Sequence, residues 1–303
     1  MVRLPVPLSV PVFTFAEQLA ACDLCGGTSL EVFSAPANIV RCQSCGYRFV
    51  SPRPSQEEIG GSYSEPDFYD QWIADEAGRM RMWAKRLELV RRVGHGARVL
   101  DIGAGIGTFL ALGRARFGWD VTGTEVSTSA VKLARERFQF ELQLGLAEEM
   151  NLPPSSFDLI TMWHVLEHVP SPARTLSLCH TLLKPGGWLA IAVPNDSDAR
   201  SWLVRTKARV RRRQAPPRYE PLHPGSEVHL SQFDARVLKQ ALESRGFRIV
   251  SVNVDDQYAN PTPRSNALVA GYRVIRSATT LNFAQAMFVL AQKQPLVSVS
   301  TPA

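Results

Sequence analysis

Long apolar runs are absent from this 303-residue sequence, because no stretch reaches the roughly 18 uninterrupted apolar residues that a membrane-spanning helix needs. Cysteine is scarce, with five residues in the chain, too few for a scaffold held together by disulfides. Charged residues make up 20% of the sequence and hydrophobic residues 45%, a balance that argues against wholesale disorder. The composition therefore indicates one large folded domain, or one domain with a small appendage.

Acidic residues are absent between positions 200 and 218, where eight residues are basic. Taking these eight charges from the net charge of +6 leaves −2 for the rest of the chain. A near-neutral protein with one basic segment differs from a generally basic nucleic-acid-binding protein. The basic segment contains Arg200, Arg205, Lys207, Arg209, Arg211, Arg212, Arg213 and Arg218.

A cleavable leader is not expected at the amino terminus. Residues 19–22 (Leu-Ala-Ala-Cys) resemble a lipoprotein cleavage site. However, three prolines interrupt the preceding apolar stretch, and Glu17 and Gln18 stand where it should continue. We therefore expect a cytoplasmic protein.

Four of the cysteines form two C-x2-C pairs separated by sixteen residues. A tight turn brings both thiolates of a pair to one metal, and four thiolates complete a closed tetrahedral zinc site of the structural kind. Two disulfides or a redox-active pair are the alternatives. The predicted zinc ligands are Cys22, Cys25, Cys42 and Cys45, while the fifth cysteine, Cys179, is expected in the hydrophobic core.

The segment from position 98 onward has the pattern of a nucleotide-binding unit. An apolar strand over 98–102 runs into a glycine turn at 103–108, and a helix over 109–117 follows. The next strand, 120–124, ends at Glu125, whose carboxylate could accept hydrogen bonds from ribose hydroxyls. Asp101 gives the spacing D-x-G-x-G-x-G, and its charge suits the ammonium group of S-adenosylmethionine (SAM). A nicotinamide enzyme is the alternative for the glycine turn alone.

These motifs resemble those of class I SAM-dependent methyltransferases over roughly residues 97–293. Further matches are 147–148 after the third strand, 156–161 on the fourth, 183–189 leading into the fifth, and the closing pair 247–254 and 287–292. The resemblance implies an α/β fold, a Rossmann-like sheet of seven strands with helices on both faces, preceded by a small zinc ribbon. It implies that SAM is bound by Asp101, Gly103, Ala104, Gly105, Gly107, Glu125, Val126, Ala147, Glu148, Trp163 and His164.

The expected domain boundaries follow from these patterns. We expect a tail over 1–17, the zinc ribbon over 18–54, a linker and an amphipathic helix over 55–96, the methyltransferase domain over 97–293 with a basic lid over 198–228, and a tail over 294–303. Within the helix, which spans 79–93, apolar residues share one face and basic residues fill the other.

The ribbon narrows the resemblance to zinc-ribbon methyltransferases of sugar and secondary metabolism. The deoxysugar C-methyltransferases among them usually carry a further carboxyl-terminal domain, whereas this chain ends soon after the seventh strand. A zinc-binding ribosomal-RNA guanine methyltransferase has the same two-part plan. Between Cys22 and Cys45, however, Arg41 is the single cation beside two acids, Asp23 and Glu31, so we do not expect nucleic acid as the partner.

The chemistry is expected at the end of the fourth strand, where Trp163 and His164 should face the methyl group. His164 has three interpretations: a residue that lines the site, the general base, or a metal ligand. His164-x-x-Glu167-His168 resembles the E-x-x-E-H metal motif of ubiquinone-pathway O-methyltransferases. On one helical turn these three side chains would share a face and could hold a divalent cation. A structural hydrogen bond is the alternative for Glu167 and His168.

His229 is the second candidate base, because in related methyltransferases a His-Leu pair before the sixth-strand helix lies near the acceptor. Tyr63, Phe68 and Tyr69 could close over SAM or the acceptor, or could pack between ribbon and core. The basic segment could be a lid that receives an anionic group of the acceptor. It could also be a solvated loop, a contact to RNA backbone, or a membrane contact that includes Trp202, Leu203 and Val204.

The sequence thus predicts methyl transfer from SAM to a small-molecule acceptor, a hydroxyl of a sugar or other secondary metabolite that could carry an anionic group. An RNA base methyltransferase and a SAM-binding scaffold without catalysis are the alternatives. A homodimer is left open.

Overall fold

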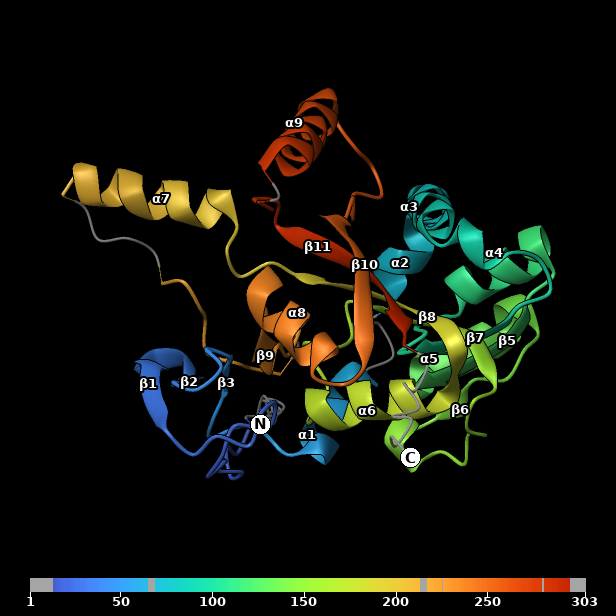
Figure 1. Ribbon diagram of the computed structural model, residues 1–303, viewed down its shortest axis with the longest axis horizontal. Coiled ribbons are helices and arrows are strands. Elements are labelled where there is room, and N and C mark those ends of the chain that lie inside the picture. Colours follow the sequence, from blue (N-terminus) through green and yellow to red (C-terminus); the bar gives the residue numbers. More distant parts are fainter. Residues whose placement is uncertain (1–12, 65–68, 213–216, 225, 280, 295–303) are drawn as a thin grey trace, which may run out of the picture.

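The computed structural model describes residues 13–64, 69–212, 217–224, 226–279 and 281–294. A central sheet of seven strands has the order β10-β11-β8-β7-β4-β5-β6. The pairs among β6, β5, β4, β7 and β8 are parallel, and β11 runs antiparallel to both β8 and β10. This is the expected class I methyltransferase sheet (Figure 1). Its strands are β4 (Arg98–Ile102), β5 (Asp120–Glu125), β6 (Gln143–Leu144), β7 (Phe157–Trp163), β8 (Leu183–Pro194), β10 (Phe247–Val254) and β11 (Ala286–Lys293).

Both faces of the sheet are apolar, because alternate residues of the buried strands point to opposite sides. On β11, for example, Met287 and Val289 join one hydrophobic cluster, whereas Phe288 and Leu290 join the other. The first cluster includes side chains of α6 and α8, and the second includes side chains of α3 and α4. The helices near the sheet are α3 (Glu76–Leu89), α4 (Thr108–Phe117), α5 (Thr128–Phe138), α6 (Pro172–Leu182), α8 (Ala235–Glu243) and α9 (Pro263–Thr279).

The ribbon forms a second sheet of order β1-β2-β3-β9, with β1 (Leu30–Ser34), β2 (Ile39–Cys42) and β3 (Arg48–Val50). Its fourth strand, β9 (Ser231–Gln232), comes from the other end of the chain. The end of the ribbon is bonded to the main fold, since Arg53 is buried, pairs with Glu17 and donates to the carbonyl of Pro170 at 2.7 Å. The short helices α1 (Gln56–Tyr63) and α2 (Asp70–Ala74) lead into α3.

Two helical expectations need correction. The helix expected over 79–93 is α3, which ends at Leu89, followed by the 3-10 turn Arg91–Val93. Its basic residues do not all face solvent, because Arg86 is buried against Asp255. The basic segment is largely the helix α7 (Ala199–Val210), which projects from the body of the molecule (Figure 1). Among the residues described, no helix is long and apolar enough to cross a membrane.

Candidate functional site

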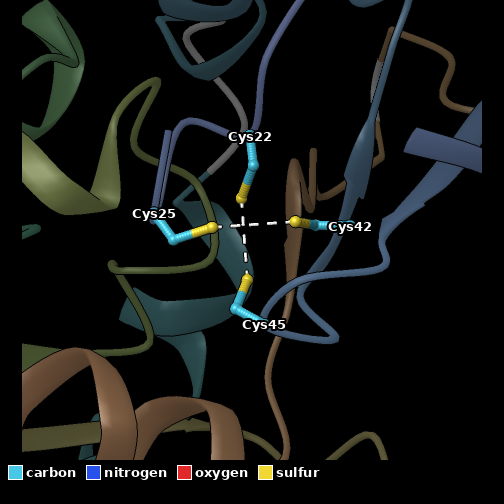
Figure 2. Close-up of side chains that lie close together, drawn as sticks. All are labelled: Cys22, Cys25, Cys42 and Cys45. Atoms are coloured by element: carbon cyan, nitrogen blue, oxygen red, sulfur yellow. Dashed lines mark hydrogen bonds between the residues drawn. The ribbon is translucent and has the colours of Figure 1, made fainter. Parts of the chain in front are cut away.

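The four paired cysteines converge on one point (Figure 2). The Sγ atoms of Cys22 and Cys45 lie 3.7 Å apart, and those of Cys25 and Cys42 lie 3.6 Å apart. A disulfide needs about 2.05 Å, whereas four sulfurs at about 2.3 Å from one zinc ion lie roughly 3.8 Å from each other. The geometry of the thiols therefore fits a tetrahedral zinc ion and does not fit disulfides. Cys179 is buried in the core, as expected.

The ribbon is bonded to the segment that carries His229. The buried Tyr47 hydroxyl, two residues beyond Cys45, bonds the hydroxyl of Ser231. The amide of Val50 donates to the carbonyl of Leu230 at 2.9 Å, and the amide of Ser231 donates to the carbonyl of Glu167 at 3.0 Å. The chain on either side of His229 is thus fixed between the ribbon and the loop after β7.

The glycine turn lies between β4 and α4, at the carboxyl ends of the parallel strands. Gly103 and Gly105 have φ angles of 68° and 54°, which a glycine adopts without steric cost. A Cβ at Gly103 would lie 2.5 Å from the side chain of Val165, and one at Gly105 would lie 3.1 Å from Trp72. The positive φ angles and the lack of space for a Cβ both require glycine at these positions. A glycine backbone can also approach a bound ligand closely.

Glu125 lies at the end of β5 and spans this turn. Its carboxylate accepts hydrogen bonds from the amides of Gly105, Val126 and Ser127 at 2.7–2.9 Å. Asp101 is fully buried on β4 and accepts a 2.5 Å bond from the hydroxyl of Thr161. Burial, together with the charge of Glu125, raises the pKa of Asp101 to about 7. Two buried carboxyl groups at one turn suit a ligand with an ammonium group and ribose hydroxyls.

The remaining predicted SAM contacts lie at two places. Ala147 is buried in a 3-10 turn after β6, and the neighbouring Glu148 carboxylate bonds the hydroxyl of Thr175 on α6. Trp163 does not present its indole to the acceptor side as expected. Its ring stacks on Phe288 at 5.6 Å and packs in the cluster of α3 and α4.

Sequence reasoning missed a cation beside the glycine turn. Arg79 on α3 stacks on Trp72, with the guanidinium carbon 3.6 Å from the ring centroid, and Trp72 in turn lies over Gly105. The buried Nε of Arg79 has no hydrogen-bond partner among the residues that the structure describes. Because α2 and α3 precede the recognised motif, spacing within the motif carried no signal for either residue.

His164 stands at the end of β7 in a left-handed conformation, with φ at 57°. Its Nε2 lies 3.0 Å from Asp255 and its Nδ1 3.4 Å from Glu167. Burial alone would lower the pKa of His164, but these two carboxylates raise it to about 9. Asp255 also accepts from Arg86 at 2.6 Å. The sequence indicated neither Arg86 nor Asp255, which come from α3 and from the residue after β10.

The loop after His164 corrects the expected metal motif. Residues 164–168 form a turn and not a helix, so the three side chains do not share one helical face. Instead, Glu167, His168 and His229 each bring a donor atom within 4.8 Å of the others. His168 Nδ1 bonds the carbonyl of Val228 at 2.7 Å, which leaves its Nε2 facing the cluster. Both oxygens of the buried Glu167 have no hydrogen-bond partner in the described part of the chain.

The aromatic residues before the core lie between the two sites. The Tyr63 hydroxyl lies 3.0 Å from His168 Nδ1 and accepts from the amide of Val228, while its carbonyl accepts from the Ser127 hydroxyl beside Glu125. Tyr69 is buried against Trp72. Phe68 lies outside the described residues.

A cavity of about 390 Å³ separates the ribbon from the carboxyl end of β8. We call it the seam cavity. His229 and Glu227 line it, with His229 Nε2 3.4 Å from Glu227 Oε2, and this contact lowers the pKa of Glu227 to about 2. His229 also faces His168, their ring centroids 4.8 Å apart. The lining includes Asn195, Asp196, Asp198, Ser201, Arg218, Tyr219, His223, Ser226 and Gln232.

The basic segment contributes little charge to this cavity. Of its described members, Arg218 lines the cavity, where Asp196 pairs with it at 2.9 Å and with Arg48 of the ribbon at 2.5 Å. Arg205, Lys207, Arg209, Arg211 and Arg212 are exposed on α7 and just after it. Arg213 lies outside the described residues. The described part of the segment is therefore mainly a helix whose cations point to solvent, and Arg218 alone among its described cations lines the cavity.

Comparison with known proteins agrees with this architecture. A family model described as a methyltransferase domain matches residues 74–252, more than half of the chain. Ubiquinone biosynthesis O-methyltransferases of Paracidovorax citrulli and Albidiferax ferrireducens are 40% and 36% identical over 119 and 110 residues. These matches cover 36% and 34% of this chain but 48% and 43% of the relatives, so the chain spans less than half the length of either.

Solved structures share the fold. A SAM-dependent methyltransferase of Thermotoga maritima covers 78% of this chain, and all of that chain is matched, with a TM-score of 0.52 and 16% identity. Phosphoethanolamine N-methyltransferase 2 of Haemonchus contortus, solved with SAM, covers 82% of this chain and 62% of its own, with a TM-score of 0.53 and 18% identity. The sheet order, the glycine turn and the family match lead to one conclusion: the chain belongs to the methyltransferase-domain family and has the fold of class I SAM-dependent methyltransferases.

Proposed function

We propose that the protein methylates a hydroxyl group of a small molecule bound in the seam cavity, with His229 as the general base. The observation that carries the proposal is the cavity itself, whose volume of about 390 Å³ falls in the range of small-molecule sites. An imidazole on its wall can take a hydroxyl proton near neutral pH. The matched relatives are named O-methyltransferases, which supports oxygen as the accepting atom.

In this proposal, separate residues bind SAM and accept the hydroxyl proton. Asp101 and Glu125 would hold the ammonium and ribose groups of SAM, and Arg79 would receive its carboxylate. SAM, when bound, supplies a methyl group activated by the sulfonium, so that an O–C bond forms as the S–C bond breaks. A proton on His229 Nε2 would face Glu227, 3.4 Å away, which leaves Nδ1 to accept the hydroxyl proton.

The lining of the cavity favours a hydroxyl-rich acceptor such as a sugar or another secondary metabolite. Ser201, Ser226 and Gln232 offer hydroxyl and amide groups. The charges of Arg218 and Arg48 are already matched in part by Asp196. An anionic acceptor group would find few unpaired cations among the described residues that line the cavity, so the basic segment is not proposed as its binding site.

Labelling tests the acceptor class. The purified protein, methyl-labelled SAM and a cell extract are incubated, and RNA, protein, lipid and small-molecule fractions are separated. We expect label in the small-molecule fraction, which mass spectrometry can then identify. Label in RNA would contradict the proposal and support the RNA base methyltransferase. Normal SAM binding with no labelled product in any fraction would support a scaffold without catalysis.

A substitution tests the base. His229→Gln should lower kcat at least about a hundredfold, because general-base catalysis contributes about 10²–10⁴-fold, and should leave the Kd for SAM unchanged. His95→Gln is the matched control, since His95 is exposed and makes an edge-to-face contact with Phe117. An unchanged kcat in His229→Gln would remove this residue from the chemistry.

The imidazole cluster supports a second proposal, in which a divalent cation binds the acceptor hydroxyl. Glu167, His168 and His229 supply one carboxylate and two imidazoles within 4.8 Å. Among the described residues, the Glu167 oxygens have no hydrogen-bond partner beyond the ion-pair contacts with His164 and His168. This set suits a transition metal better than magnesium. Metal analysis decides it: the cation proposal predicts one metal equivalent beyond the ribbon zinc, lost in His168→Gln. Ribbon zinc alone in both proteins would exclude it.

A further inference from the structure

The helix α7 exposes apolar side chains that a globular protein normally buries. Trp202 is 64% exposed, Leu203 57% and Val210 78%. A surface helix usually turns its apolar stripe towards the core, and no described side chain of α7 belongs to any hydrophobic cluster of the protein. The projecting position of α7 in Figure 1 agrees with this lack of cover.

The exposed apolar residues of α7 form a stripe with cations along its edges. Leu203 and Val210 are seven residues apart and therefore lie two turns apart on one face, with Trp202 beside Leu203. Arg209 flanks this stripe on one side and Lys207 on the other. An apolar stripe bordered by cations is the pattern of a helix that lies in the plane of a membrane surface.

The helix α9 repeats this combination. Leu268 and Ile275 are again seven residues apart and exposed, and Val274 beside them is 66% exposed. Its exposed cations include Arg264 and Arg273, the latter 3.8 Å from Asp256. Neither α7 nor α9 contains an acidic residue.

The start of α7 lies next to the segment that follows the end of α9. The amide of Ala199, the first residue of α7, donates to the carbonyl of Phe283, four residues after the end of α9. The side chain of Asn195 donates to the carbonyls of Asn282 and Ala284 at 2.9 Å. This anchoring joins α7 and α9 at the carboxyl end of β8.

We propose that the exposed surface of α7 and α9 docks on an anionic lipid bilayer. The charge is complementary, because both helices are cationic and free of acids, and each basic residue near such a surface contributes attraction. The exposed Trp202, Leu203 and Val210 would enter the interface between headgroups and acyl chains, a contact that RNA does not offer. A second copy would present the same positive surface and be repelled.

Docking would hold the seam cavity near the bilayer. Asp198 and Ser201, at the start of α7, line that cavity. Since no described helix can span a membrane, the attachment is peripheral and reversible. It does not depend on which residue acts as the base.

Vesicle sedimentation tests the proposal with the full-length protein. We expect binding to phosphatidylcholine vesicles that contain about one-third phosphatidylglycerol, weak binding to pure phosphatidylcholine, and loss of most binding at high salt. The double variant Trp202→Ser/Leu203→Ser and the double variant Lys207→Gln/Arg209→Gln should each lower the partition coefficient by about tenfold or more.

Matched controls change the same chemistry elsewhere on the surface. Val32→Ser and Leu144→Ser remove apolar side chains that are 72% and 52% exposed, and Lys132→Gln/Arg135→Gln removes two exposed charges from α5. All variants should keep the native Kd for SAM, which shows that they fold. Equal binding by the α7 variants and these controls would overturn the proposal. So would RNA binding that survives Trp202→Ser/Leu203→Ser while vesicles fail to bind, or a dimer that this variant abolishes.

Discussion

Asp101 carries a carboxyl group in the middle of the sheet, next to the glycine turn. Its pKa of about 7 results first from burial and then from the nearby Glu125, and the bond from Thr161 and the more distant Arg86 oppose the rise. In an unfolded chain an aspartate has a pKa of about 3.9. Between about pH 4 and 7 the folded protein therefore holds a proton that the unfolded chain has released, so the stability of the SAM-free protein falls as pH rises and levels off above pH 7.

We predict that Asp101→Asn flattens this profile and weakens SAM binding. The neutral amide removes the titration, so the melting temperature of the SAM-free variant should change less between about pH 4 and 7. SAM affinity above pH 7 should fall about tenfold or more, because the ammonium group loses a charged partner. Thermal melts and calorimetric titration measure both. Asp120→Asn, at an exposed aspartate paired with Arg98, is the control, and a native-like profile and Kd in Asp101→Asn would refute the assignment.

Contacts between residues far apart in the sequence could not be predicted from the local motifs. The spacing around Asp101 predicted that acid, and the two C-x2-C pairs predicted a convergence of four thiols. No spacing predicted that Arg86 and Asp255, 169 residues apart, would meet beside His164. Nor could a helical turn be excluded at 164–168 from sequence. His164 has a left-handed φ, its amide donates to Ala192 of β8, and its ring contacts Asp255, and these partners are remote in the sequence.

The strand β9 is the element that couples the ribbon to the candidate site. It completes the ribbon sheet through its pairing with β3, and it begins two residues after His229. The Tyr47 hydroxyl bonds Ser231 within this pairing, both residues being buried. A change in the ribbon should therefore move the acceptor side of the site and leave the SAM side intact.

We predict that Tyr47→Phe lowers kcat/KM for the acceptor by about fivefold to tenfold and leaves the Kd for SAM and the zinc content unchanged. The buried Ser231 hydroxyl loses its partner, a loss of about 1–3 kcal/mol, and the strand that positions His229 loosens. Steady-state kinetics and metal analysis measure these quantities. The control variant is Ser156→Ala, which removes a hydrogen-bonded hydroxyl just before β7. It should leave kcat/KM for the acceptor, the Kd for SAM and the zinc content unchanged. A proportional loss of SAM binding in Tyr47→Phe would point to general destabilisation instead.

Elements with a period or a turn signal were predictable, and elements defined by remote partners were not. The strands β4, β8 and β10 follow apolar runs bounded by glycine or proline. The helix α6 begins after Ser171, whose hydroxyl accepts from the Arg174 amide, and Pro172 follows it. β9 has two residues and exists because β3 pairs with it. The sequence of the basic segment did not distinguish a lid over the acceptor from a projecting helix, because both structures expose the same charged residues to solvent.

At the scale of the whole molecule, the ribbon and the sheet share one hydrophobic core. Cys22, Cys45 and Phe49 of the ribbon belong to the same buried cluster as Met287 and Val289 of β11. Arg245, two residues after α8, donates to the carbonyl of Leu24 in the ribbon at 2.8 Å. An element that shares its core with the main sheet cannot unfold without exposing apolar surface on both sides.

We therefore predict that the zinc-loaded protein unfolds in a single calorimetric transition, and that removal of zinc lowers its midpoint by more than about 10 °C. Zinc binding supplies several kcal/mol or more to small ribbons, and each kcal/mol corresponds to about 2–4 °C in a protein of this size. A chelator would also remove any cation bound at Glu167, so the variant Cys25→Ser is the control for the ribbon zinc. It should lower the melting midpoint as the chelator does, because it removes a zinc ligand and leaves Glu167, His168 and His229 unchanged. Two separate transitions, with the main one unaffected by the chelator, would mean that the ribbon is an independent module. In that case a change in the ribbon would not affect His229 through β9, because the main sheet and the segment that carries His229 would stay folded when the ribbon melts.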